Sequence, residues 1–293
     1  MQIAFIGLGN MGGGMAANQA KAGRIVRAFD VSKDALDRAA AAGCVAAASA
    51  ADAVKGANAV VTMLPSGAHV RAVYEADVLP NAEQGAMLID CSTIDVETAR
   101  AVAADAIKRA MRPADAPVSG GMSAANTGSL AFMVGCAEKD FTEIESVLAP
   151  MSRATIRAGD YGAGQAAKIC NNMLLAISMI GVSEAFALAE KLNLDAGRFF
   201  EIASKSSGQC WSLTSYCPWP GVIEGTPASN GYKPGFATAL MLKDLRLARD
   251  AARSTGAVSP LGEHAEELYA NWVEAGQAHS DFSSIVELFR RGH

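Results

Sequence analysis

The sequence has few charged or aromatic residues and lacks a long uninterrupted run of apolar side chains. Of its 293 residues, 19% are charged and 6% are aromatic, whereas 51% are hydrophobic. The apolar stretches are broken before they reach the ~20 residues that a membrane-spanning helix requires. We therefore expect a soluble chain with a large core and, at this length, two domains.

Clusters of lysine and arginine are also missing. The net charge is −5, from 25 basic and 30 acidic residues, and no basic run stands out. Because nucleic acid and anionic membranes attract grouped positive charge, we expect neither partner and favour a small-molecule ligand. The apolar run at residues 3–6 opens almost at Met1 without a basic leader, which indicates a first strand rather than a signal peptide and predicts a cytoplasmic protein.

No cysteine pair has the spacing of a metal site. The six cysteines include no CxxC pair and have no histidine nearby at ligand spacing. We therefore predict reduced thiols and no bound metal. The cysteines are Cys44, Cys91, Cys136, Cys170, Cys210 and Cys217.

Short β-type runs alternate with alanine-rich helical stretches as far as about Arg157, which is typical of a parallel sheet covered by helices on both faces. Beyond Tyr161 the strand patterns end, and residues 164–191 predict one proline-free helix of ~42 Å. We predict an α/β fold: a Rossmann-type doubly wound parallel sheet, residues 1–162, followed by an all-helical domain, residues 163–293, joined by the long helix. The predicted strands are residues 2–6, 25–29, 59–63, 87–90 and 131–134; further helices are expected near 195–205, 238–254, 260–276 and 282–290.

A glycine motif follows the first predicted strand and opens a helix, which is the context that dinucleotide binding requires. Gly7 permits a tight turn, Gly9 lets the backbone approach a pyrophosphate, and Gly12 allows close packing of helix and strand. Asp30 ends the second predicted strand, where a carboxylate can accept hydrogen bonds from ribose hydroxyls and repel a 2′-phosphate. The cofactor predicted is therefore NAD rather than NADP, although Lys33 weakens that preference. The motif residues expected to bind it are Gly7, Gly9, Asn10, Met11 and Gly12.

Two further strand ends lie where ligands bind in open parallel sheets. Leu64 and Pro65 follow one strand, Ser92 and Thr93 follow another, and both segments are expected to line the cofactor. For Ser92 and Thr93, an N-cap of the helix that begins near Asp95 is an equally good interpretation.

Four ordered motifs resemble the β-hydroxyacid dehydrogenase family, and within it the 3-hydroxyisobutyrate dehydrogenases. The resemblance spans nearly the whole chain. The motifs are FIGLGNMG at residues 5–12, DAPVSGG at 115–121, GAGQAAKICNN at 162–172 and KDL at 243–245.

The resemblance implies a Rossmann domain and a helical domain joined by one long helix, with the active site in the cleft between them. It further implies that Ser119, Gly120 and Gly121 hold a substrate carboxylate, and that the chain forms a homodimer or homotetramer. Lys168 is then the catalytic residue with Asn172 beside it. Lys243 is expected to contact the cofactor with Asp244 as its partner, and Trp211 and Phe236 to contact the substrate.

The chemistry of these residues fits that assignment. Lys168 and Asn172 are four residues apart, so on one helix they lie on the same face. A lysine removed from water can accept the hydroxyl proton while hydride leaves for NAD, and nothing in this reaction requires a covalent intermediate. A Ser-Gly-Gly turn can present a hydroxyl and backbone N–H groups to a carboxylate, although the same turn can simply end a strand.

Several features limit the assignment. Relatives usually carry arginine at the position of Gln209 and asparagine at that of Cys217, in a loop expected to border the pocket.

Oxidation of 3-hydroxyisobutyrate is the favoured reaction. Oxidation of L-serine or another small 3-hydroxy acid is the alternative, because one methyl group on the substrate discriminates by only ~1–3 kcal/mol. Tartronate semialdehyde reduction and a non-catalytic nucleotide-binding scaffold are less favoured. Pro113 would disrupt a central strand, so an edge or a bulge is expected there.

Alkylation of the thiols in the folded protein should leave turnover possible, because no cysteine is assigned as a nucleophile or a metal ligand. Cys170→Ala, two residues from the expected base, should likewise retain activity. The rate of cofactor reduction and the mass of the protein during turnover check this. An acyl-cysteine intermediate, or loss of turnover in Cys170→Ala, would contradict it.

Overall fold

The structure, a computed structural model, describes residues 1–291 of the chain, with side chains as far as residue 290. The chain divides into two compact units, Met1–Lys168 (unit 1) and the remainder from Ile169 onward (unit 2). The division falls inside a helix, at residue 168 rather than at the expected boundary after residue 162.

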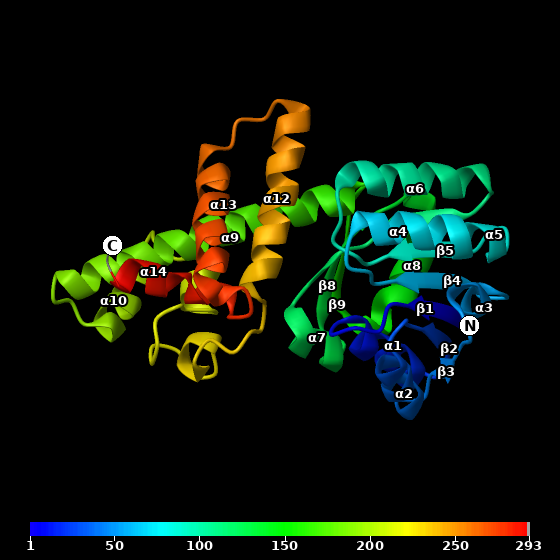
Figure 1. The fold of residues 1–293 in the computed structure, drawn as a ribbon, viewed down its shortest axis with the longest axis horizontal. Helices are drawn as coiled ribbons and strands as arrows, with labels where there is room; N and C mark the ends of the chain where they lie inside the picture. Colours follow the sequence, from blue (N-terminus) through cyan, green and yellow to red (C-terminus); the bar gives the residue numbers. More distant parts are fainter. Residues whose placement is uncertain (292–293) are drawn as a thin grey trace. The chain divides into compact units, whose positions relative to one another are not determined.

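Unit 1 is built on one sheet of nine strands, counted over the described residues (Figure 1). The strand order is β3-β2-β1-β4-β5-β6-β8-β7, with β9 paired to β8, and β1 to β6 run parallel. The chain reverses its direction of winding between β1 and β4, the position where such sheets bind dinucleotides. The strands are β1 Gln2–Ile6, β2 Ile25–Phe29, β3 Val45–Ala46, β4 Ala59–Thr62, β5 Met87–Asp90, β6 Arg112–Asp115, β7 Val118–Ser119, β8 Leu130–Gly135 and β9 Ser152–Gly159.

Helices cover both faces of this sheet (Figure 1). Ile3 and Phe5 of β1 pack on one face with α1, α2 and α8, whereas Ala4 and Ile6 pack on the other face with α3, α4 and α6. Because successive strand residues point to opposite faces, this double burial explains why β1 has no polar residue after Gln2. The helices of unit 1 are α1 Gly12–Lys21, α2 Lys33–Ala41, α3 Ala50–Val54, α4 Gly67–Val73, α5 Leu79–Asn81, α6 Val96–Lys108, α7 Gly121–Thr127 and α8 Phe141–Leu148, with short turns η1 Tyr74–Val78, η2 Glu138–Asp140 and η3 Ala149–Met151.

The five predicted strands are present as β1, β2, β4, β5 and β8, and the sequence analysis missed β3, β6, β7 and β9. Pro113 lies in β6, which is not an edge strand of the sheet. Over Arg112–Ala114 only β5 pairs with β6, and β8 joins it at Asp115 alone. The position of Pro113, which has no N–H to donate, is therefore flanked by a strand on one side only, and no bulge is needed.

Unit 2 is helical, as expected. The long helix α9, Ala163–Lys191, runs 29 residues and carries unit 1 into unit 2. By length and composition α9 could cross a membrane, contrary to the expectation from apolar runs. The core helix of a soluble protein passes the same test, and half of the most apolar window of α9 is buried inside the protein. The other helices are α10 Ala196–Ala203, α11 Trp211–Thr214, α12 Thr238–Thr255, α13 Pro260–Trp272 and α14 Val286–Arg291, with turns η4 Pro227–Asn230, η5 Val273–Gln277 and η6 Phe282–Ile285.

Candidate active site

The glycine motif forms the tight turn between β1 and α1. Gly7 has φ +93°, and a Cβ there would overlap the carbonyl oxygen of Met63. A Cβ on Gly12 would overlap the carbonyl oxygen of Gly7, so the start of α1 lies directly against the turn. At Gly9, by contrast, a Cβ would have no protein atom within 4 Å. Two glycines are thus required by the protein itself, and the third leaves the space that a pyrophosphate needs.

Asp30 closes this turn from the end of β2. Its Oδ2 accepts the N–H of Leu8 at 2.6 Å, and its Oδ1 accepts the N–H of Ser32 at 2.8 Å. A carboxylate has about four lone-pair directions, so two remain for the hydroxyls of a ribose. Asp30 therefore holds the glycine turn and still has the acceptor capacity that NAD binding requires.

A buried polar cluster joins the ends of β4 and β5. Asp90 Oδ1 accepts the hydroxyls of Thr62 at 2.7 Å and Ser92 at 2.6 Å, and Ser92 Oγ accepts the N–H of Leu64 at 2.8 Å. Burial raises the pKa of Asp90, and the hydrogen bonds from Ser92 and Thr62 oppose that shift. The cluster fixes the two loops that carry Leu64 and Thr93, both predicted to line the cofactor.

The alternative interpretation of Ser92 and Thr93 as an N-cap is wrong. The N-cap of α6 is Asp95, whose carboxylate accepts the N–H of Thr98 at 2.7 Å. Ser92 is fully buried, and its hydroxyl donates to the Asp90 carboxylate and accepts the N–H of Leu64.

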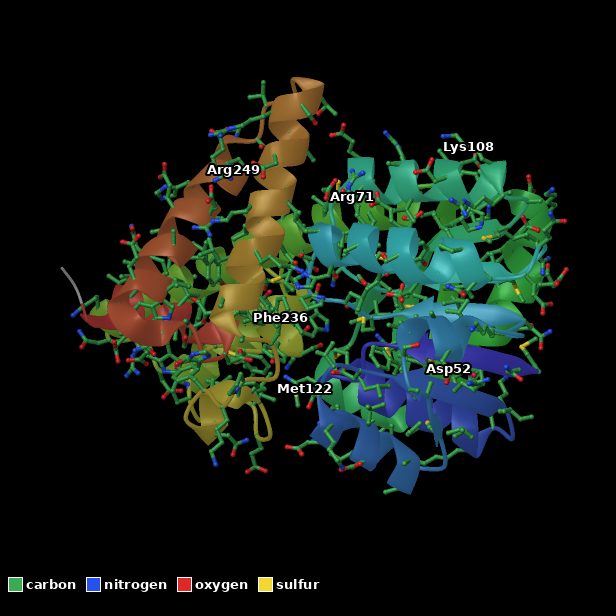
Figure 2. The ribbon with its side chains drawn as sticks, turned by 45° about the vertical axis from the view of Figure 1, so that its right-hand side comes forward. Asp52, Arg71, Lys108, Met122, Phe236 and Arg249 are labelled. Atoms are coloured by element: carbon green, nitrogen blue, oxygen red, sulfur yellow. The ribbon has the colours of Figure 1, made fainter. Side chains whose placement is uncertain are left out.

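The predicted carboxylate-binding turn lies between β7 and α7. Gly120 and Gly121 have φ values of +134° and +69°, which favour glycine, and Ser119 is half-buried. Met122 follows the turn and is 41% exposed (Figure 2). The helix that begins here packs on α1, because Asn18 Nδ2 donates to the carbonyl oxygen of Ala125 at 2.8 Å. Two helices that start at predicted ligand-binding turns are therefore neighbours in unit 1.

Lys168 is buried near the start of α9, with 7% of its surface exposed. The first turn of that helix is tied to unit 1 by Asp115, whose carboxylate accepts the N–H groups of Gly162 at 2.6 Å and Gln165 at 2.8 Å. Burial raises the pKa of Asp115 to about 6, against the lowering effect of these two hydrogen bonds. The predicted base thus lies on a helical turn whose position is fixed by a strand end.

Asn172 continues the same face of α9 into unit 2. Its Nδ2 donates to Asp244 Oδ2 at 2.6 Å, and its Oδ1 accepts from Asn171 Nδ2 at 3.0 Å. Lys243 Nζ lies 3.6 Å from the other oxygen of Asp244. Asp244 therefore orients Asn172 through one carboxylate oxygen and lies beside Lys243 with the other.

Aromatic side chains of unit 2 surround the other predicted substrate contacts. Trp211 is half exposed and stacks on Tyr216, with ring centroids 5.0 Å apart. Phe236, labelled in Figure 2, lies edge-on to Phe282 at 5.7 Å. Asp281 orders this loop, since one carboxylate oxygen accepts the Tyr216 hydroxyl at 3.0 Å and the Phe236 N–H at 3.0 Å.

The two departures from the family pattern lie in different environments. Gln209 is exposed and donates to Thr214 Oγ1 at 3.3 Å. Cys217 is fully buried in an apolar cluster of unit 2 with Phe186 and Trp219, so its thiol packs inside the protein, and the expectation that its loop borders the pocket stays a prediction. The chain turns this side chain inward because a thiol packs as a small apolar group.

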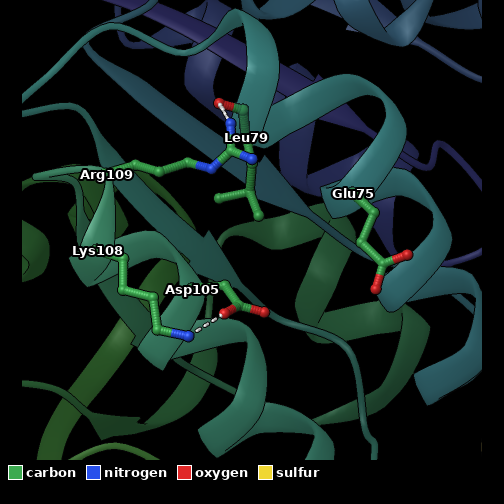
Figure 3. Close-up of a pocket in the computed structure, with 5 residues that line it drawn as sticks. All are labelled: Glu75, Leu79, Asp105, Lys108 and Arg109. Carbon is green, nitrogen blue, oxygen red and sulfur yellow. Dashed lines mark hydrogen bonds and ion pairs between the residues drawn. The ribbon is translucent and has the colours of Figure 1, made fainter.

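A separate hollow on the outer surface of unit 1 has a volume of about 320 Å³ and contains none of the predicted site residues (Figure 3). Lys108 is paired with Asp105 at 2.8 Å, and Arg109 donates to the carbonyl oxygen of Leu79 at 3.2 Å. The charges of Lys108 and Asp105 are therefore matched within the protein. Among the described residues, no cluster of three metal-ligating side chains occurs either.

Sequence reasoning missed the residues that support the site. Asp115 and Gln165 stood inside quoted motifs without a role, and Asp90 and Asp281 were not considered. A signal for Asp90 was present, because it is an acidic residue at the end of a predicted apolar strand, where burial demands hydrogen-bonding partners.

The strand order, the glycine turn and Asp30 define a dinucleotide-binding dehydrogenase domain followed by a helical unit. A family model described as the NAD binding domain of 6-phosphogluconate dehydrogenase matches residues 2–159. Another, described as the NAD-binding of NADP-dependent 3-hydroxyisobutyrate dehydrogenase, matches residues 162–289. The chain binds a nicotinamide dinucleotide.

Curated relatives and a solved structure agree over the full length. The probable 3-hydroxyisobutyrate dehydrogenase of Mycobacterium tuberculosis is 49% identical over 288 residues, 98% of this chain and 97% of that protein. The NAD-dependent L-serine dehydrogenase of Pseudomonas aeruginosa is 45% identical over 290 residues, 98% of this chain and 97% of that protein. A structure of the M. tuberculosis 3-hydroxyisobutyrate dehydrogenase with L-serine superposes with a TM-score of 0.95 at 48% identity, covering 99% of each chain. The chain belongs to the 3-hydroxyisobutyrate dehydrogenase family.

Gly9→Ala and Gly12→Ala should have different effects. The Gly9 methyl group meets no protein atom, so the melting temperature should stay unchanged while the Kd for NAD rises about tenfold or more, equivalent to about 1.4 kcal/mol. The Gly12 methyl group overlaps backbone, so this variant should lose about 1–3 kcal/mol of stability as well as affinity. Calorimetry and thermal unfolding measure both quantities. Unchanged NAD affinity in Gly9→Ala would rule out the pyrophosphate position.

Proposed function

We propose that this protein oxidises 3-hydroxyisobutyrate to methylmalonate semialdehyde with NAD, and that Lys168 is the general base. The observation that carries the proposal is the placement of Lys168, 7% exposed, one helical turn before an asparagine that is oriented by Asp244. The relatives named 3-hydroxyisobutyrate dehydrogenase support the same substrate. We further propose a cytoplasmic homo-oligomer.

Lys168 takes the proton of the substrate hydroxyl. The bound nicotinamide supplies the acceptor for the hydride that leaves the carbinol carbon. Removal from water disfavours a charged amine, which suits a lysine that must accept a proton. In the reverse direction the Lys168 ammonium returns the proton to the aldehyde oxygen, so protons and electrons balance in both directions.

Ser119, Gly120 and Gly121 bind the substrate carboxylate in this proposal. The positive φ values of Gly120 and Gly121 turn the chain sharply at the end of β7, and the small residues leave the N–H groups accessible to an anion. The second N–H of the Asn172 amide orients the substrate, because Asp244 occupies only the first. Trp211 and Phe236 contribute apolar contacts to the rest of the substrate.

L-Serine is the second candidate substrate. It carries the same carboxylate and β-hydroxyl, so the residues that hold those groups are the same. A relative named NAD-dependent L-serine dehydrogenase is 45% identical, and the similar solved structure is described with L-serine. The difference between the two substrates lies at the α-substituent, a methyl group or an ammonium.

Asp30 is proposed to select NAD over NADP, so Asp30→Ala should raise the ratio of kcat/KM with NADP to that with NAD by at least about tenfold, the effect of one charge-assisted hydrogen bond. Both absolute values should fall, because Asp30 also holds the Leu8 N–H. Asp30→Asn keeps the shape without the charge and should move the ratio in the same direction. Equal use of the two cofactors by the unmodified protein would refute the assignment.

Lys168→Ala should lower kcat on 3-hydroxyisobutyrate by about 10²–10⁴-fold, the usual contribution of a general base. The Kd for NAD should remain near its original value, because the glycine turn and Asp30 are untouched. Lys191→Ala is the matched control: it removes an exposed lysine from the other end of α9 and should leave kcat unchanged. A folded Lys168→Ala protein that retained more than about a tenth of the rate would disprove the mechanism.

A further inference from the structure

Gln165 makes two hydrogen bonds that bracket a single residue of the β5–α6 loop. Its Nε2 donates to the carbonyl oxygen of Ser92 at 2.7 Å, and its Oε1 accepts the N–H of Ile94 at 3.1 Å. The residue between them is Thr93. The side-chain amide of Gln165 therefore pairs with this loop as a neighbouring strand would, and it is fully buried.

The helical turn that carries Gln165 has little freedom to move. Asp115 accepts the N–H groups of Gly162 and Gln165, and a Cβ on Gly164 would overlap the carbonyl oxygen of Met133. A Cβ on Gly135 would likewise overlap the Asp115 carboxylate. The absence of side chains at Gly164 and Gly135 thus lets the first turn of α9 pack directly against β8 and against the Asp115 carboxylate.

We propose that Gln165 is a positioning residue that sets the place of Thr93 relative to Lys168. Asp115 holds the first turn of α9 by accepting the N–H groups of Gly162 and Gln165. Lys168 follows Gln165 by three residues, so both lie on adjacent positions of the same helix face. The inference rests on the proposed function, in which Thr93 contacts the nicotinamide and Lys168 takes the proton. The buried amide of Gln165 then links Thr93, beside the hydride acceptor, to the helical turn that carries Lys168, which accepts the proton.

This arrangement matters because hydride and proton leave adjacent atoms of one substrate. A displacement of ~1 Å between reacting groups can cost about 10²-fold in rate. Loss of the Gln165 bonds should therefore lower kcat. It should affect NAD affinity much less, because the glycine turn and Asp30 hold the other end of the cofactor.

Gln165→Glu gives a distinctive test. The carboxylate can still accept from Ile94, but its second oxygen faces the carbonyl oxygen of Ser92, and the two repel. Protonation turns that oxygen into a donor and restores the bond. Burial and the carboxylates of Asp115 and Asp90 on the neighbouring strand ends favour the protonated form, whereas Lys168 on the same helix and Arg100, which lies against Gly162, oppose it.

The quantity to measure is the ratio of kcat for each variant to kcat for the unmodified protein, from about pH 9 to about pH 6. Using the ratio cancels the titration of the base itself. For Gln165→Glu the ratio should be about 10²-fold low at the alkaline end and rise toward one as the pH falls. Gln165→Leu, the matched apolar control, should stay low at every pH, and both variants should keep their Kd for NAD.

Two kinetic outcomes would overturn the inference: kcat ratios near one for both variants, or a Gln165→Glu ratio that stays as low as that of Gln165→Leu across the range. Amide exchange at Ile94 keeps the inference testable if a variant fails to fold. In the unmodified protein this amide should exchange as slowly as strand amides such as Ile89, and exchange at the rate of an exposed loop amide would also overturn the inference. The proposed function fails separately, if Lys168→Ala keeps its rate while Ile94 remains protected.

Discussion

The acceptance of two N–H groups by the buried carboxylate of Asp115 is the interaction on which the site depends. The first N–H groups of a helix have no partner within the helix. At the start of α9 the N–H groups of Gly162, which precedes the helix, and of Gln165 bond to a strand end, which explains why the first turn belongs to unit 1. The pKa of Asp115, about 6 in the folded chain, lies above its value in an unfolded chain, so the stability from this group is complete below about pH 4 and is lost as the pH rises through 6. At neutral pH the chain thus keeps an ionised acceptor at the start of α9 although burial disfavours it.

Much of this fold follows from sequence patterns, and the exceptions have physical causes. The strands Gln2–Ile6 and Met87–Asp90 are apolar except for one end residue, and the helix α9 is long and free of proline, so their patterns identify them. β6 was missed because Pro113 argues against a strand, and only its one-sided pairing makes the proline acceptable. β9 was missed because its residues alternate between exposed and half-buried positions rather than forming an apolar run.

The site was predicted less completely than the fold. Local sequence spacing is enough to identify the glycine turn, Asp30 and the pair of Lys168 and Asn172. It does not identify the residues that hold them in place, because Gln165 reaches across 73 residues of chain to Ser92 and Asn172 reaches across 72 to Asp244. Such pairings depend on tertiary structure. The same holds for Cys217, whose burial beside Phe186 and Trp219 follows from tertiary packing rather than from its place in the loop.

In the proposed reaction this chain passes a hydride from a small 3-hydroxy acid to NAD. The most direct measurement is the initial rate of NADH formation with 3-hydroxyisobutyrate, L-serine, glycerate and 3-hydroxypropionate, each at saturating NAD and repeated with NADP. We expect turnover of at least one 3-hydroxy acid with NAD, the highest kcat/KM for 3-hydroxyisobutyrate, and a smaller value for every substrate with NADP. An absence of turnover with all four acids in a folded protein that binds NAD would contradict it.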